Sequence, residues 1–157
     1  MVYYTSKKIS PHPLLGKIYI NLVESSQQRN ILGTTAGIDG KTFKTVVEKT
    51  LNSAKLSTSD KETAPYFLDV LLTKASSPSL GEVYVSSTVE IHYRLFEKSS
   101  NKEILNESII SEYTAPFKTP YTITLKRQRA FEGAIKSNMK KLTQHLKNLH
   151  DFSKVSK

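Results

Sequence analysis

The sequence predicts a two-layer α+β sandwich, a four-stranded mixed sheet with two helices on one face. Residues 82–97 alternate between apolar and polar side chains, which is typical of a strand with one buried side and one solvent-facing side. Two other stretches, one after Asp39 and one at 123–149, place apolar residues at helical spacing. The resulting order is β–α–β–β–β–α, and a sheet with one wet face requires both helices to cover the other face.

Four segments are predicted to be strands. Residues 17–25, "KIYINLVES", alternate and contain β-branched side chains. Residues 66–74, "YFLDVLLTK", are largely apolar, as in a central strand. Residues 82–97 and 102–113 flank the turn "KSSN" and therefore predict a hairpin. Along 82–97 we expect one buried set, Val83, Val85, Ser87, Val89, Ile91, Tyr93 and Leu95, and one exposed set, Tyr84, Ser86, Thr88, Glu90, His92 and Arg94.

Two segments are predicted to be helices. Asp39 is the expected N-cap of the first, which runs to about Leu56 and has one broad apolar face: Phe43, Val46, Val47, Leu51 and Ala54. The second spans 123–149, and the face expected to dock on the sheet carries Phe131, Ile135, Asn138, Leu142, Leu146 and Leu149. We expect an extended lead-in at 1–16, a single domain at 17–150 and a basic tail at 151–157.

The positive charge is concentrated at one end of the chain. The 157 residues carry a formal net charge of +9, from 23 Lys and Arg against 14 Asp and Glu. Residues 1–117 contain 13 basic and 12 acidic residues, a net of +1, whereas residues 118–157 contain 10 and 2, a net of +8. This asymmetry predicts an anionic partner, either nucleic acid, a phospholipid surface or an acidic polymer, although a solvated helix face would give the same pattern.

A basic stripe along the last helix supplies the candidate binding residues. On a helical wheel, Lys136, Lys140 and Lys147 fall within about 20° of Arg129, and Gly133 falls about 40° from it. The wheel predicts that Gly133 lies on the outer side, away from the sheet. Because glycine costs about 1 kcal/mol in a helix interior, we expect either a partner that approaches the helix closely there or a tolerated defect.

No catalytic constellation is found in the sequence. "TAGIDGKT" at 35–42 resembles a phosphate-binding loop, but Thr35 replaces its first glycine, and a helix start capped by Asp39 explains the same residues. The absence of cysteine excludes disulfides and thiolate chemistry. His145 and His150 lie five residues apart, so a helix would direct them about 140° apart, too far to share a metal. We therefore expect no enzyme activity, no cofactor and no metal site.

A double-stranded RNA-binding domain is the alternative interpretation. A helix, three antiparallel strands and a basic helix follow one another in that order, with "LKRQRAFEGA" near the start of the last helix. Against it, the loop "ASSPSLG" lacks the Gly-Pro-x-His type of motif of that family, and the basic residues run along the whole helix.

Residues 66–149 resemble a set of small lipoproteins of the Gram-negative envelope. The matching pieces are "YFLDVLL", "VEIHYRLFEKSSNKEI" and "RAFEGAIKSNMKKLTQHL", with Glu132 to Asn138 the most distinctive part. The resemblance is to periplasmic lipoproteins of the lipopolysaccharide-assembly and transport-auxiliary kind, whose domains are two helices on a mixed four-stranded sheet. It departs from them in one respect, since this sequence has no cysteine for lipid modification and no signal segment.

The resemblance implies a non-enzymatic scaffold or auxiliary binding protein. Its partner would be an envelope protein or an anionic lipid surface, bound in the periplasm at the outer membrane. Membrane association would then use a lipid anchor that this chain lacks, with residues 1–16 as a tether.

Overall fold

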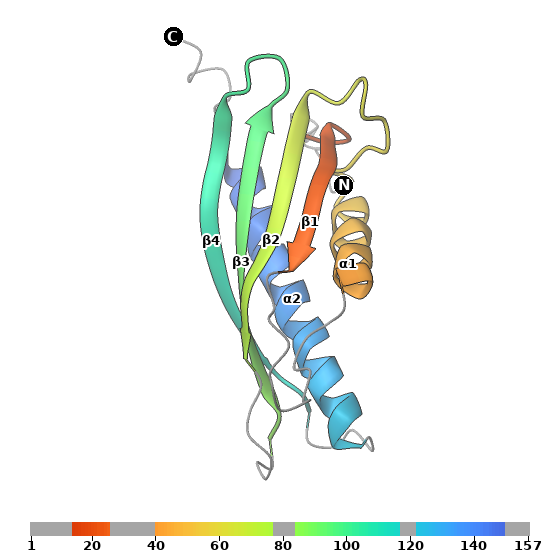
Figure 1. The fold of residues 1–157 in the computed structure, drawn as a ribbon, viewed down its shortest axis with the longest axis vertical. Helices are drawn as coiled ribbons and strands as arrows, with labels where there is room; N and C mark the ends of the chain where they lie inside the picture. The colour runs from red at the N-terminus through yellow and green to blue at the C-terminus, as the bar shows by residue number, and fades with distance from the viewer. Residues whose placement is uncertain (1–13, 26–39, 77–83, 117–121, 150–157) are drawn as a thin grey trace, which may run out of the picture.

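The computed structural model describes residues 14–25, 40–76, 84–116 and 122–149, and it confirms the predicted α+β sandwich and element order (Figure 1). The expected cap at Asp39, Val83 and residues 151–157 lie outside the described part of the chain. The elements are β1 (Ile18–Ser25), α1 (Gly40–Ser53), β2 (Tyr66–Ser76), β3 (Ser86–Glu97), β4 (Glu103–Thr114) and α2 (Ile123–Asn148).

The four strands form one mixed sheet in the order β1-β2-β3-β4. β1 pairs with β2 in parallel, across the crossover through α1, and the other two pairs are antiparallel. β2 and β3 are the two central strands, as expected for residues 66–74, and the cross-strand pairs of β3 run from Ser86–Thr114 and Ser76–Thr88 at one end to Tyr66–Glu97 at the other. β1 and β4 are the two edges of the sheet, as Figure 1 shows.

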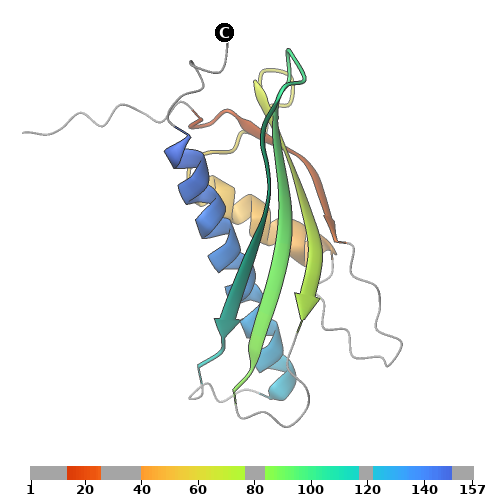
Figure 2. The same ribbon diagram turned by 90° about the vertical axis from the view of Figure 1, so that its left-hand side faces the viewer.

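Both helices lie on the same face of the sheet, and the other face carries no described helix (Figure 2). α2 crosses β3 and β4, while α1 packs beside it against β1. The core between the layers contains Phe43, Val47 and Leu51 of α1 and Phe131, Ile135, Leu142 and Leu146 of α2, which confirms the docking faces of both helices. Leu14, which precedes the predicted start of the domain, is also fully buried in this core.

The alternation along β3 is confirmed for the residues that the structure describes. The odd-numbered side chains from Val85 to Leu95 are buried under the helices, and the even-numbered side chains from Tyr84 to Arg94 are exposed or partly exposed. Phe96 is the apolar exception on the open side, where its ring packs edge-on against Phe67 with the centroids 5.8 Å apart. Tyr19 contacts the same Phe67 ring from β1, so a small aromatic cluster covers one end of the open face.

Asn138 is the one polar residue of α2 that is fully buried among those described. Its side-chain oxygen accepts a hydrogen bond from the Tyr93 hydroxyl at 2.7 Å, and its Nδ2 donates to the Ile109 carbonyl at 2.6 Å. The Tyr93 hydroxyl also lies 3.2 Å from the Met139 sulfur. These bonds tie α2 to β3 and β4, and they satisfy a side-chain amide that would otherwise be costly to bury.

Candidate functional site

The two layers of the molecule carry opposite charge. Helices α1 and α2 contain ten Lys and Arg against two Glu, a net of +8. The four strands contain two Lys and Arg against seven Asp and Glu, a net of −5. We refer to the outer side of α1 and α2 as the basic layer. The sequence placed the excess charge on α2, and the fold adds Lys41, Lys44 and Lys49 of α1 beside it.

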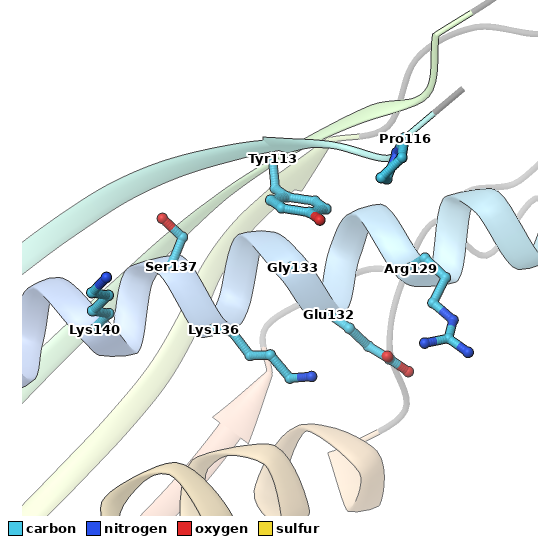
Figure 3. A pocket seen from close by; sticks show the side chains of 8 residues that line it. All are labelled: Tyr113, Pro116, Arg129, Glu132, Gly133, Lys136, Ser137 and Lys140. Atoms are coloured by element: carbon cyan, nitrogen blue, oxygen red, sulfur yellow. The ribbon is translucent and has the colours of Figure 1, made fainter. Parts of the chain in front are cut away.

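A pocket of about 630 Å³ lies where α2 passes the end of β4 (Figure 3). Its walls combine an aromatic ring, a proline and three cationic side chains around one carboxylate. The lining residues are Tyr113, Pro116, Arg129, Glu132, Gly133, Lys136, Ser137 and Lys140. Four of the five predicted binding residues are therefore brought together in one depression.

A second pocket of about 550 Å³ lies between the two helices and shares Glu132 and Lys136 with the first. Its other lining residues come from α1, namely Lys41, Thr45, Val46, Lys49 and Thr50. In Figure 3 the side chains of Glu132 and Lys136 point from α2 toward the side on which α1 lies. The two pockets together form what we call the basic groove, which runs over the outer surface of the helical layer.

The positive charge of the groove is poorly compensated within the described part of the chain. Lys136, Lys140, Lys41 and Lys49 form no ion pair there, and the α1 pair Lys44–Glu48 is long, at 3.9 Å. Glu132 is the groove's single carboxylate, and it accepts a hydrogen bond from Gln128 at 3.2 Å. A surface with this balance attracts anions and repels cations.

Lys147 is exposed near the end of α2 but does not line the groove. The neighbouring His145 instead contacts Glu107 of β4, with Nδ1 2.6 Å from Oε1. One turn earlier, Lys141 donates from Nζ to the Ile110 carbonyl at 2.8 Å. The C-terminal part of α2 thus uses polar side chains to fasten itself to the sheet edge.

The predicted outward position of Gly133 is wrong. A Cβ added at Gly133 would lie 2.2 Å from Cδ1 and 2.5 Å from Cγ of Tyr113, a residue of the chain's own β4. The Tyr113 ring therefore rests directly on the helix backbone, as Figure 3 shows. A helical wheel gives the direction of each residue, but it does not show how much of the helix surface the sheet covers. Here a side chain of the edge strand β4, Tyr113, covers α2 up to the border of the basic stripe. Gly133 is present because no side chain fits under that ring.

Sequence reasoning missed the residues that the fold adds to the groove. Tyr113 pairs across the sheet with the buried Ser87 and lies two residues after the buried Ser111 on β4, so the period-2 pattern directs its side chain to the helical side. Lys41 and Lys49 lie on the outer side of α1, opposite Phe43 and Leu51. The helical period of the sequence would have been enough to predict this position. What the sequence could not supply is which end of β4 meets which turn of α2.

Several kinds of site are not found within the described ranges. No cluster of three His, Cys, Asp or Glu side chains there could hold a metal. None of the described helices is both long enough and apolar enough to cross a membrane. The arrangement can attract, orient and hold an anion, and the Tyr113 ring adds an apolar contact beside the charges.

The fold is shared with several bacterial proteins of low sequence identity. A candidate lipoprotein from Caulobacter crescentus matches with a TM-score of 0.56 at 14% identity, over 85% of this chain and 89% of that one. A minor lipoprotein from Acinetobacter baumannii matches with a TM-score of 0.50 at 14% identity, over 86% and 93% of the two chains.

A third match is to PelC from Paraburkholderia phytofirmans, solved as a dodecamer, with a TM-score of 0.53 at 12% identity over 82% and 89% of the chains. No known protein family and no curated protein sequence matches the chain. At these identities the comparisons show a common fold, which two proteins described as lipoproteins share with this chain.

Proposed function

We propose that this protein is a non-enzymatic domain of a cell-envelope lipoprotein and that it binds an anionic partner through the basic groove. The observation that carries the proposal is the groove itself. Two adjoining pockets, of about 630 and 550 Å³, collect cations from two separate helices around a single carboxylate. A merely solvated helix face would not need cations from both helices to converge on one depression.

The envelope assignment draws on the shared fold. The Caulobacter and Acinetobacter proteins are described as lipoproteins, and PelC is a dodecamer. We carry over to this chain the envelope setting, a position in the periplasm at the outer membrane and a scaffolding or auxiliary role. A lipopolysaccharide-assembly or transport-auxiliary pathway is the finer assignment that the sequence resemblance implies.

The binding role is tested with lipid vesicles as the anionic probe. The domain should co-sediment with vesicles rich in phosphatidylglycerol and not with vesicles of phosphatidylcholine alone. The double variant Lys136→Glu/Lys140→Glu should weaken binding by more than about tenfold, because each Lys near an anionic surface contributes about 1 kcal/mol. Lys61→Glu/Lys102→Glu is the matched control, since it changes the net charge equally at exposed residues away from the helices.

Equal loss of binding in both double variants would show that net charge alone is responsible, and it would overturn the assignment of the site. Duplex RNA is the second probe, because a nucleic-acid-binding domain is the alternative. An RNA complex that is tight at physiological salt and stronger than vesicle binding would favour that alternative.

The envelope role is tested separately in the bacterium that encodes the protein. The product of its full gene should incorporate labelled fatty acid and fractionate with the outer membrane. A product that takes up no fatty acid and fractionates with the cytoplasm would contradict the envelope assignment without affecting the vesicle result.

A further inference from the structure

The open side of the sheet is acidic. Five carboxylates point to this side from all four strands, and among the described residues they face three cationic side chains. The carboxylates are Glu24, Asp69, Glu90, Glu103 and Glu112, and the cations are Lys74, Arg94 and Lys98, whose Nζ lies 5.6 Å from the centroid of the Phe67 ring. We refer to this side as the acidic face.

All three cations of the acidic face are already engaged, and Lys98 donates from Nζ to the carbonyls of Lys61 and Glu62. Lys74 lies 3.2 Å from Glu90, and the Arg94 Nε lies 2.9 Å from Glu103. Hydrogen bonds from Asn106 and Arg94 lower the pKa of Glu103, so this carboxyl stays ionised at neutral pH. The remaining three carboxylates have no ion pair within the described residues, which leaves the face with a net negative charge.

Exposed apolar side chains accompany these carboxylates. Ile110 of β4 is 59% exposed and pairs across the sheet with Glu90, and Leu22 of β1 is 41% exposed beside Asp69. Both would lose contact with water if another surface covered the acidic face, which would favour association. No described helix covers this side of the sheet (Figure 2).

We propose that the acidic face of one copy docks on the basic layer of a second copy. The proposal rests on the proposed function, because it assigns a partner to the same basic groove. The two surfaces lie on opposite sides of the molecule and differ in sign: the helices carry +8, and the acidic face carries five carboxylates against three cations, a net of −2. Two basic layers would repel each other, and so would two acidic faces.

The association is therefore head-to-tail rather than two-fold symmetric. Such an interface leaves one unused surface on each end of a pair, so it continues to add copies until a ring closes or a filament forms. Because the attraction is electrostatic, it weakens with added salt.

The test uses two variants, each of which weakens a different surface. Lys136→Glu/Lys140→Glu weakens the basic layer and leaves the acidic face intact. Glu24→Lys/Glu112→Lys does the reverse, using carboxylates without an ion pair in the described residues. Sedimentation velocity should show that the wild-type protein associates at low salt and becomes monomeric at about 0.5 M salt. Each variant alone should be monomeric at low salt.

An equimolar mixture of the two variants should form a one-to-one complex, because the intact basic layer of one can bind the intact acidic face of the other. Net charge cannot drive this pairing, because both variants are positively charged and would repel each other. The formal net charge changes from +9 to +5 in Lys136→Glu/Lys140→Glu and to +13 in Glu24→Lys/Glu112→Lys. Lys61→Glu/Lys102→Glu should associate as the wild type does.

Three outcomes would overturn the proposal: a wild-type protein that stays monomeric at low salt, variants that associate alone as well as the wild type does, or a mixture that stays monomeric. If the mixture fails while the basic-layer variant still loses vesicle binding, the groove serves a lipid surface and not a second copy. If vesicle binding also survives that variant, the proposed function fails as well.

Discussion

Gly133 and Tyr113 form a contact between α2 and β4 in which an aromatic ring takes the space of a missing side chain. The nearest atoms to an added Cβ include Cγ, at the base of the ring, so rotation of the ring about its own axis would not relieve the clash. The whole Tyr113 side chain would have to swing away from the helix. Tyr113 is 39% exposed, so room for that movement exists on the solvent side.

Gly133→Ala should therefore destabilise the domain, even though alanine is the better helix former. Overpacking costs about 1–3 kcal/mol, against a gain of up to about 1 kcal/mol from helix propensity. In a Tyr113→Ala background the same substitution should become neutral or stabilising. Urea unfolding of the four proteins gives the coupling between the two residues. A stability gain from Gly133→Ala in the wild-type background would show that the ring does not rest on the helix.

Asn138 is the buried polar residue on which the position of α2 depends. Asn138→Ala should cost about 1–3 kcal/mol, because it leaves the Ile109 carbonyl without its side-chain donor and the Tyr93 hydroxyl without its main acceptor. Tyr93→Phe should cost less, since Asn138 keeps its bond to Ile109. Thermal or urea unfolding measures both, and a larger loss from Tyr93→Phe would reverse the order that these bonds predict.

The Tyr93 hydroxyl also makes the free energy of unfolding depend on pH in the alkaline range. Burial first, and the negative charge of Glu107 second, raise the pKa of Tyr93 well above its ordinary value. Below about pH 10 the phenol is neutral in both the folded and the unfolded chain, and above it the unfolded chain gains by ionising. The wild-type protein should therefore lose stability relative to Tyr93→Phe as the pH rises past about 10. Parallel loss in both proteins would contradict this assignment.

At the scale of elements, periodicity was enough to predict all six segments in their order. The alternation of Val89, Ile91 and Tyr93 against Glu90, His92 and Arg94 determined the register of β3, because a shift by one residue would exchange the two faces. The helical period likewise located the buried side of α2. The contact at Gly133 could not be predicted, because it depends on where the Tyr113 end of β4 lies relative to α2. No local sequence pattern contains the relative position of two separate elements.

Leu142 tests the docking of α2 on the sheet. Its side chain is fully buried in the core, so Leu142→Ala should cost about 2–5 kcal/mol of unfolding free energy. Lys140→Ala, two residues earlier on the exposed side, is the matched control and should stay within about 0.5 kcal/mol of the wild type. Similar small effects at both positions in urea unfolding would mean that α2 is not packed as described.

On the scale of the whole molecule, the fold places the basic residues mainly on the helices and the acidic residues mainly on the sheet. The sequence located the excess of Lys and Arg near its C-terminal end, but only the tertiary structure shows that the two helices together are basic and the sheet is acidic. The polarity runs through the thin direction of the sandwich, from one layer to the other. It gives the molecule two distinct surfaces of opposite charge.

The central claim is that the basic layer is occupied by a partner in the cell. The most direct measurement is site-specific photo-crosslinking in living cells, with the reactive residue placed at position 140 in the groove or at position 102, in the turn between β3 and β4. We expect adducts from position 140, with either a second copy of the chain or a lipid, and few or none from position 102. Adducts from position 102 with none from position 140 would contradict the central claim.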